Sequence, residues 1–227
     1  MSRLTSWATA CLLAAPAMSE PLVCPGAGPP ITVTAMKAER AVHLCHVARA
    51  ARDRLAACHL PQSAPIEIRI VPTLPAQHEK CMGLYNCDTK VIEILDLAGL
   101  RARVAPSSAF ARIPPDALQD SLVAHEMTHA LIHQRLGPNS GPLVLNEYIA
   151  YAMQLDAMAD PARRTLLATR DIKPPVPPEA LNEMILLMAP DVFAIFAWHH
   201  FREPEHGCAL IGQLLDGAPG PFPDMIP

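Results

Sequence analysis

Residues 114 to 138 predict one long helix whose apolar side carries two histidines. Pro114-Pro115-Asp116 is typical of a helix start, and Gly137-Pro138 is typical of a helix end. Between these signals, apolar residues and histidines recur at steps of three and four positions: Leu118, Leu122, His125, His129, Ile132 and Leu136. Residues with this spacing form one stripe along a helix, and such a stripe faces a hydrophobic core. Any fold of this chain must therefore bury His125 and His129.

Two buried imidazole rings need partners, because a polar atom left unpaired in a core costs about 1 to 3 kcal/mol. His125 and His129 stand at positions i and i+4, so their rings point the same way, about 6 Å apart along the helix axis. This spacing allows both rings to bind one Zn²⁺ at nitrogen distances of about 2.0 to 2.1 Å. Glu126 lies on the helix flank, where it can reach a water on such a metal, as in the H-E-x-x-H motif.

A catalytic zinc site needs a third protein ligand and one open position. His133 continues the stripe, but it lies about 12 Å along the axis from His125, which is too far to join the same ion. Glu147, in "LNEYIAYAM", belongs to the apolar stripe of the next predicted helix. A carboxylate there needs a counter-charge, which a metal supplies. The sequence therefore predicts one Zn²⁺ per chain, bound by His125, His129 and Glu147.

The segment "HEMTH", followed by Glu147 within "LNEYIAY", resembles the gluzincin metallopeptidases, in which a glutamate on the following helix is the third zinc ligand. Leu145-Asn146-Glu147, with Ala150 and Tyr151 after it, is similar to the third-ligand segment of the zinc aminopeptidases of that group. The resemblance covers residues 118 to 152. It implies a mostly helical, zincin-like core with a small antiparallel or mixed sheet.

The resemblance also implies roles for four residues. His125, His129 and Glu147 would ligate zinc, and Glu126 would be the general base. Many gluzincins place an aspartate four residues after the ligand glutamate, where it orients a histidine. This chain has Tyr151 at that position.

The implied function is that of an exported zinc metallopeptidase acting on peptide or protein substrates. Glu126 would activate a zinc-bound water for attack on the peptide bond. By analogy with the family, the edge of a strand at residues 91 to 97 is expected to hold an extended peptide. Tyr151, His199 and His200 are candidates for stabilising the oxyanion.

Two alternatives remain open at this level. The first is a catalytically inactive zinc-binding protein that keeps the gluzincin core and binds peptide or protein partners. The second is a disulfide-stapled interaction domain in which the histidines only pack.

The first 19 residues have the three parts of a signal peptide. Arg3 supplies the positive charge, "WATACLLAA" at residues 7 to 15 is the apolar run, and Ala15-Pro16-Ala17 or Ala17-Met18-Ser19 offers a cleavage site. The apolar run is too short to span a bilayer. The alternative is an N-terminal core helix. We expect export to the periplasm or the extracellular space, with no membrane span.

The cysteines are consistent with export. One of the seven, Cys11, lies within the predicted signal peptide, which leaves an even number in the mature chain. Cys45 and Cys58 fall on one predicted helix, about 20 Å apart, and cannot bond to each other. Cys81 and Cys87 enclose "MGLYN", which is turn-like, and we expect them to pair. Two bonds then remain, in which Cys24 and Cys208 take Cys45 and Cys58 in either order. Free buried thiols are the alternative.

The remaining pattern predicts an α+β fold, and the resemblance implies a single gluzincin-like domain at residues 20 to 227. An Ala-rich helix is expected at residues 35–58, and two strands, paired antiparallel, at residues 66–71 and 91–97. After residue 114 the pattern predicts helices at residues 115–136, 143–158, 160–170 and 179–203, the last with a break at Pro190.

Composition and charge exclude some classes of protein. Apolar residues make up 51% of the chain and charged residues 18%, which excludes disorder for most of it. The formal net charge of −4, without a basic stripe, gives no nucleic-acid surface. His43 and His46 stand three apart on the first helix and could share a metal, but no third ligand is near, and surface or core packing is the expected role.

Overall fold

The structure, a computed structural model of the chain, describes residues 20–138 and 140–222. The signal peptide predicted for residues 1–19 lies outside the described residues. The strands are β1 (Leu22–Val23), β2 (Ile31–Thr34), β3 (Ile66–Val71), β4 (Gly83–Asn86) and β5 (Val91–Leu95). The helices are α1 (Ala38–Ala57), α2 (Leu97–Arg103), α3 (Pro115–Leu136), α4 (Leu143–Ala157), α5 (Asp160–Leu167), α6 (Glu183–Met188), α7 (Pro190–Phe201) and α8 (Gly207–Leu215). Short 3-10 helices lie at Ala76–His78, Ala109–Arg112 and Pro178–Ala180.

The strands form a mixed sheet in the order β1-β2-β3-β5-β4. β2, β3 and β5 run parallel, and β1 and β4 are antiparallel strands at the two edges. Ile68 and Ile70 of β3 are buried on one face, whereas Arg69 between them is exposed on the other. The sheet therefore has one face in the core and one towards solvent. The predicted α+β class, with its small mixed sheet and disulfides, is confirmed.

Both predicted strands are present, but their predicted antiparallel pairing is wrong. β3 and β5 are parallel, because β4 lies between them in the chain and reverses the chain direction once more. A tight hairpin joins β4 to β5. In it, the Asn86 side-chain oxygen accepts hydrogen bonds from the backbone amides of Asp88 and Thr89.

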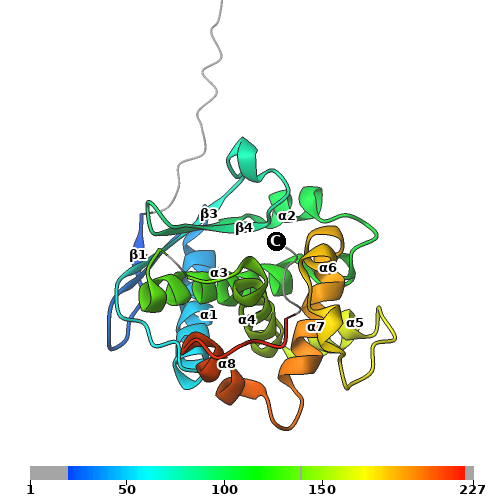
Figure 1. Cartoon of the computed structure of the whole chain (residues 1–227). Coiled ribbons are helices and arrows are strands. Elements are labelled where there is room, and N and C mark those ends of the chain that lie inside the picture. Colours follow the sequence, from blue (N-terminus) through cyan, green and yellow to red (C-terminus); the bar gives the residue numbers. More distant parts are fainter. Residues whose placement is uncertain (1–19, 139, 223–227) are drawn as a thin grey trace, which may run out of the picture.

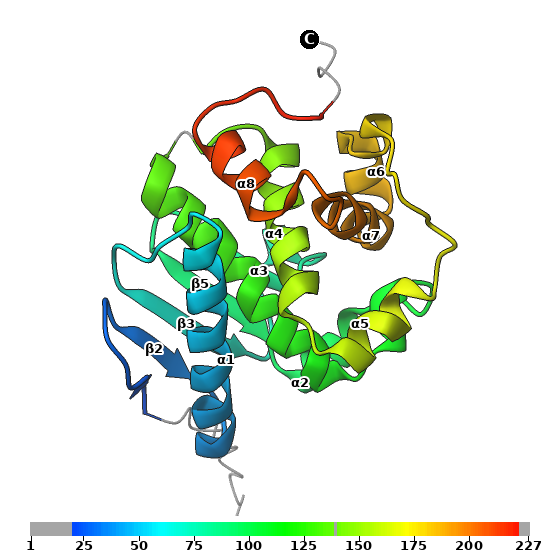
Figure 2. The same cartoon turned by 90° about the horizontal axis from the view of Figure 1, so that it is seen from below.

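Two helices cover the buried face of the sheet. α1 packs against β1 and β2, and α3 packs against β4 and β5; Figure 2 shows both helices in front of the strands. α4 lies against α3 on the side away from the sheet, and α7 packs on α4 (Figure 1). α3 is thus enclosed on both sides, and residues 121–128 are all buried. The predicted burial of His125 is confirmed, whereas His129 is half-buried.

The helix ends follow the local signals. α3 begins at Pro115, directly after Pro114, and is followed by Gly137 in a left-handed conformation, with φ of 74°. The other predicted helices are also present, and the one at residues 179–203 divides at Pro190 into α6 and α7. The short elements β1, β2, β4, α2 and α8 were not predicted.

His43 and His46 lie on the exposed side of α1. The His43 Nε2 atom is 2.7 Å from an Asp120 carboxylate oxygen, and Arg40 donates to the other oxygen of Asp120 at 2.7 Å. Within the described residues, neither histidine belongs to a group that could hold a metal ion. Of the two expected roles, surface residue and core packing, the surface role is therefore the correct one for both histidines.

Two disulfides link the first helix to distant parts of the chain. Cys24 is bonded to Cys45, and Cys58 to Cys208, with Cα–Cα distances of 5.2 and 4.4 Å. The structure thus selects one of the two pairings that the sequence left open. The second bond ties the end of α1 to α8.

The predicted Cys81–Cys87 disulfide is wrong, because both thiols are free. The intervening "MGLYN" was taken for a turn, but it contains β4. An extended strand advances about 3.3 Å per residue, which separates the two Cα atoms far beyond the roughly 7 Å that a disulfide can span.

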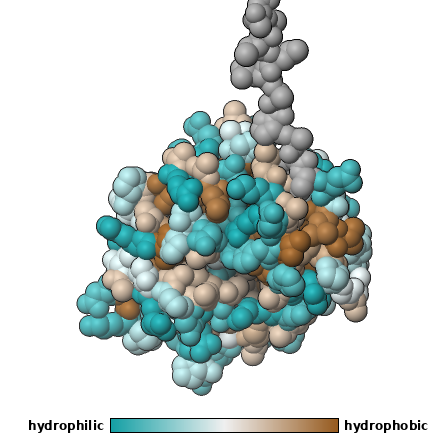
Figure 3. All heavy atoms as spheres, turned by 180° about the vertical axis from the view of Figure 1, so that it is seen from behind, coloured by the Kyte–Doolittle hydropathy of each residue, from teal (hydrophilic) through white to brown (hydrophobic). Residues whose placement is uncertain are grey.

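The surface seen from behind mixes hydrophilic and hydrophobic residues (Figure 3). Among the described residues, no helix combines the length and apolar character that crossing a membrane requires.

The free thiols can be tested by counting thiols in the unfolded, unreduced chain. We expect Cys81→Ser and Cys87→Ser each to lower the count by one, because each removes a free thiol. Cys24→Ser is the matched control, and it should raise the count by one by releasing Cys45. A higher count in Cys81→Ser would instead show that Cys81 and Cys87 are bonded.

Candidate metal centre

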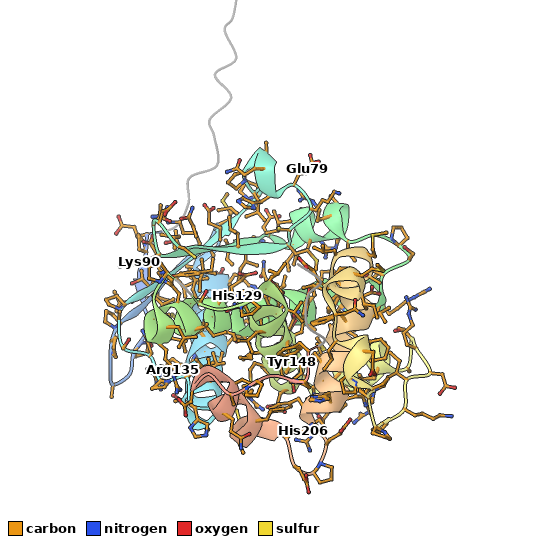
Figure 4. The ribbon with its side chains drawn as sticks, viewed as in Figure 1. Glu79, Lys90, His129, Arg135, Tyr148 and His206 are labelled. Atoms are coloured by element: carbon orange, nitrogen blue, oxygen red, sulfur yellow. A yellow bond between two sulfur atoms is a disulfide. The ribbon has the colours of Figure 1, made fainter. Side chains whose placement is uncertain are left out.

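The three predicted ligands meet where α3 and α4 pack together. His125 and His129 project from successive turns of α3, and Glu147 projects from the first half of α4. The two Nε2 atoms are 3.1 Å apart. One Glu147 oxygen lies 3.5 Å from His129 Nε2, and the other lies 3.6 Å from His125 Nε2. Figure 4 shows His129 near the middle of the molecule.

These distances fit a metal ion. Ligand atoms about 2.0 to 2.1 Å from a tetrahedral Zn²⁺ lie about 3.4 Å from one another. The separation of the two Nε2 atoms is near this value, and each Nε2 atom has a different Glu147 oxygen at a similar distance. One ligand atom from each of His125, His129 and Glu147 lies within 4.8 Å of the others, and the cluster could hold a metal ion. The donor set of two imidazoles and one carboxylate is one that catalytic zinc sites use.

Burial sets the charges of the ligands. Burial and the neighbouring His129 hold the pKa of His125 well below its ordinary value, and burial lowers the pKa of His129 to about 4. Both rings are therefore neutral at pH 7, the state that binds metal. Burial also raises the pKa of Glu147 to about 7. A divalent cation would favour the ionised carboxylate, which is costly to bury alone.

The side chain of Glu126, a residue of α3, lies against the edge strand β4. Its pKa is raised to about 8, mainly by burial and further by Glu147, while a hydrogen bond from the Tyr85 backbone amide lowers it. A Cβ atom on Gly83 would come within 2.5 Å of a Glu126 side-chain oxygen. Only glycine allows the strand to approach the carboxyl group this closely.

A cavity of about 580 Å³ opens over these residues. Its lining includes the three ligands, Glu126, Leu122, the strand β4 with the residues before it, and residues of α4. Tyr151 also lines it, and its ring centroid lies 4.6 Å from that of His125. The group of His125, His129 and Glu147 can therefore be reached by a small molecule or a peptide from the cavity.

Several predictions about the surroundings of the site need correction. β5 has a neighbour on each side, so residues 91–95 offer no free edge; the edge strand at the site is β4. Of the three candidate oxyanion donors, Tyr151 lines the cavity, whereas His199 and His200 are not among its lining residues. His200 Nδ1 is instead 2.8 Å from the Tyr148 hydroxyl. Tyr148 lies below His129 in Figure 4.

His133 is outside the metal cluster, as predicted. Its Nδ1 atom lies 3.0 Å from the Tyr85 hydroxyl, so it links α3 to β4 instead. Sequence reasoning missed Gly83, Tyr85 and Gln154 as residues of the site. The glycine inside "MGLYN" was the available signal, because a glycine within a strand often marks a close backbone approach.

Comparison with known proteins gives a family without an assigned function. The model described as "Family of unknown function (DUF6639)" matches residues 31–219. This range contains the three ligands and Glu126. No curated protein and no solved structure shows significant similarity to the chain.

The first prediction for the site concerns its ligands. Alanine at His125, His129 or Glu147 should abolish stoichiometric zinc binding, because two remaining ligands hold the ion weakly. His133→Ala is the matched control: it removes a histidine one turn farther along the same helix and should leave zinc binding unchanged. Metal analysis after dialysis measures both effects. Equal zinc content in all four variants would rule out this cluster.

The second prediction concerns pH. Because the pKa of Glu147 is raised to about 7, the metal must displace a proton from this carboxyl group at lower pH. Burial holds the pKa of His125 well below its ordinary value and lowers that of His129 to about 4, so both histidines are already neutral there and contribute no protons. Zinc affinity should therefore fall about tenfold per pH unit below pH 7 and level off above it. Titration against a chromophoric chelator from pH 5.5 to 8 measures the slope, and a flat profile would contradict the assignment.

Proposed function

The chain belongs to this family of unknown function, and we propose that it is an exported zinc-dependent metallopeptidase that hydrolyses bonds in peptide or protein substrates. One observation carries the proposal. The His125, His129 and Glu147 donors form a metal-sized cluster at a cavity, with the carboxyl group of Glu126 beside it. This is the residue set of a metal-assisted hydrolytic site, three ligands and a base.

Zinc bound at this cluster would polarise a substrate carbonyl and lower the pKa of a coordinated water. The chain's own contribution is to hold both imidazoles neutral and to place a proton acceptor next to them. Glu126 has its pKa raised to about 8 by burial and by Glu147. A carboxyl group with a pKa near neutrality can take a proton from the attacking water and pass it to the leaving amine.

The edge strand β4 suits an extended peptide. The Leu95 amide donates to the Met82 carbonyl, so residues 82, 84 and 86 bond to β5. The backbone groups of Gly83 and Tyr85 consequently point to the open edge, where the Tyr85 amide already reaches Glu126. A peptide added along this edge would lie beside the metal ligands in the cavity.

Tyr151 is the residue that would donate a hydrogen bond to the oxyanion formed during hydrolysis. It is the member of the three candidates that lines the cavity. Burial raises the pKa of its hydroxyl above the ordinary value, so the group keeps its proton and can donate a hydrogen bond.

Export is supported by the disulfides and by the sequence of residues 1–19. Cys24–Cys45 and Cys58–Cys208 require an oxidising compartment to persist. A periplasmic or extracellular location meets this requirement.

The decisive test is Glu126→Gln. The amide keeps the shape of the side chain and removes the proton acceptor, so hydrolysis should fall by at least about 100-fold. Zinc content should remain at the wild-type level, because Glu126 is not a ligand. Cleavage of fluorogenic peptide libraries and of unfolded casein measures the first effect, and metal analysis measures the second.

Two outcomes would contradict the proposal. Unchanged hydrolysis in Glu126→Gln would remove the residue from the reaction. If the wild-type protein binds zinc but cleaves no substrate, the alternative function, a catalytically inactive zinc-binding protein, would be favoured.

A further inference from the structure

We propose that Gln154 is a positioning residue for His125: it accepts a hydrogen bond from Nδ1 and thereby directs the Nε2 lone pair at the metal. Gln154 follows Glu147 by two helical turns of α4, so both side chains face α3. It is completely buried, with 0% of its surface exposed. The inference rests on the metal site of the proposed function but does not require hydrolysis.

Two buried atoms at this contact lack a hydrogen bond of standard geometry. They are Nδ1 of His125 and Oε1 of Gln154. Gln154 is nevertheless the side chain whose hydrogen bonding raises the pKa of His125, against the larger lowering by burial and by His129. We therefore assign each atom as the partner of the other.

A relay of hydrogen bonds fixes which end of the Gln154 amide faces the histidine. The Ser121 hydroxyl donates to the Leu118 carbonyl at 2.8 Å, which uses its single proton. Ser121 must therefore accept from Gln154, and Gln154 Nε2 lies 3.1 Å from it. With Nε2 held by Ser121, Oε1 is the atom left for His125.

The relay selects one tautomer of His125. An amide oxygen can only accept, so Nδ1 must carry the proton. Nε2 then has the lone pair, and this is the atom that faces His129 and Glu147. The opposite tautomer would place two buried acceptors against each other with no proton between them. The ring is therefore prepared for the metal before the metal binds.

This arrangement differs from the one that the sequence motif suggested. The position four residues after Glu147 is Tyr151, whose ring packs on His125. The partner of Nδ1 instead comes from Gln154, nearly one turn later on α4, and it is neutral. A neutral acceptor fixes the ring without adding a third buried carboxyl group beside Glu126 and Glu147.

The test begins with the tautomer in the metal-free wild-type protein. Long-range ¹H–¹⁵N NMR of ¹⁵N-histidine-labelled protein at pH 7.5, with His125 assigned through His125→Ala, should show protonation at Nδ1 alone. In Gln154→Leu the Nε2-protonated tautomer should appear, and zinc affinity should fall about 10- to 100-fold. Gln154→Glu in its neutral acid form keeps a carbonyl acceptor for Nδ1 and an O–H donor for Ser121, so it should restore the tautomer and most of the affinity.

Gln119→Leu is the matched control. Gln119 is also completely buried and lies on α3, but its amide donates to the Leu95 carbonyl, away from the metal cluster. It should lower stability without changing the His125 tautomer or zinc affinity.

Three results would overturn the proposal. The first is Nε2 protonation of His125 in the wild-type protein, which needs no variant to fold. The second is an unchanged tautomer and zinc affinity in Gln154→Leu. The third is an equal effect of Gln119→Leu. None of these measurements uses hydrolysis, so a protein that binds zinc and cleaves nothing would leave this inference standing.

Discussion

The packing of α4 on α3 is the contact on which the rest of the structure depends. It places polar side chains from both helices inside a core, where a polar or charged group is tolerated only with a partner. His125 and His129 face Glu147 across this contact, and the Gln154 amide donates a hydrogen bond to the Ser121 hydroxyl. The hydrogen bond to Ser121 satisfies the Gln154 amide nitrogen, and the two imidazoles with the Glu147 carboxylate form a group that could hold a metal ion. Under the proposed function, metal binding would therefore stabilise the helix pair.

The sheet completes the site from the other side. β4 is an edge strand that passes close to α3, and Gly83 removes the side chain that would collide with Glu126. The same approach brings the Tyr85 amide to that carboxyl group and the Tyr85 hydroxyl to His133. Glu126, the candidate ligands and the free strand edge thus share one cavity, which α3, α4 and β4 line together.

Much of this was predictable from local pattern. The ends of α3 follow from Pro115 and Gly137, and the ligand pair follows from histidines one turn apart in an apolar stripe. Glu147 was identified because a charged group in an apolar stripe needs a partner. The orientation of the strands and the state of Cys81 were predicted wrongly, because a short strand was taken for a turn. The role of Gln154 was missed, because a glutamine in a helix carries no signal of its own.

The sequence by itself determined the longer helices, the α+β class and the identity of the candidate ligands. These depend on periodicity and spacing along one helix, which a chain expresses locally. Tertiary structure alone decided the parallel pairing of β3 with β5, the choice of Cys24–Cys45 and Cys58–Cys208, and the hydrogen bond of Gln154 to Ser121. Each of these contacts joins residues from separate parts of the chain. Whether such residues meet depends on how the whole core packs, so no local sequence pattern predicts the contact.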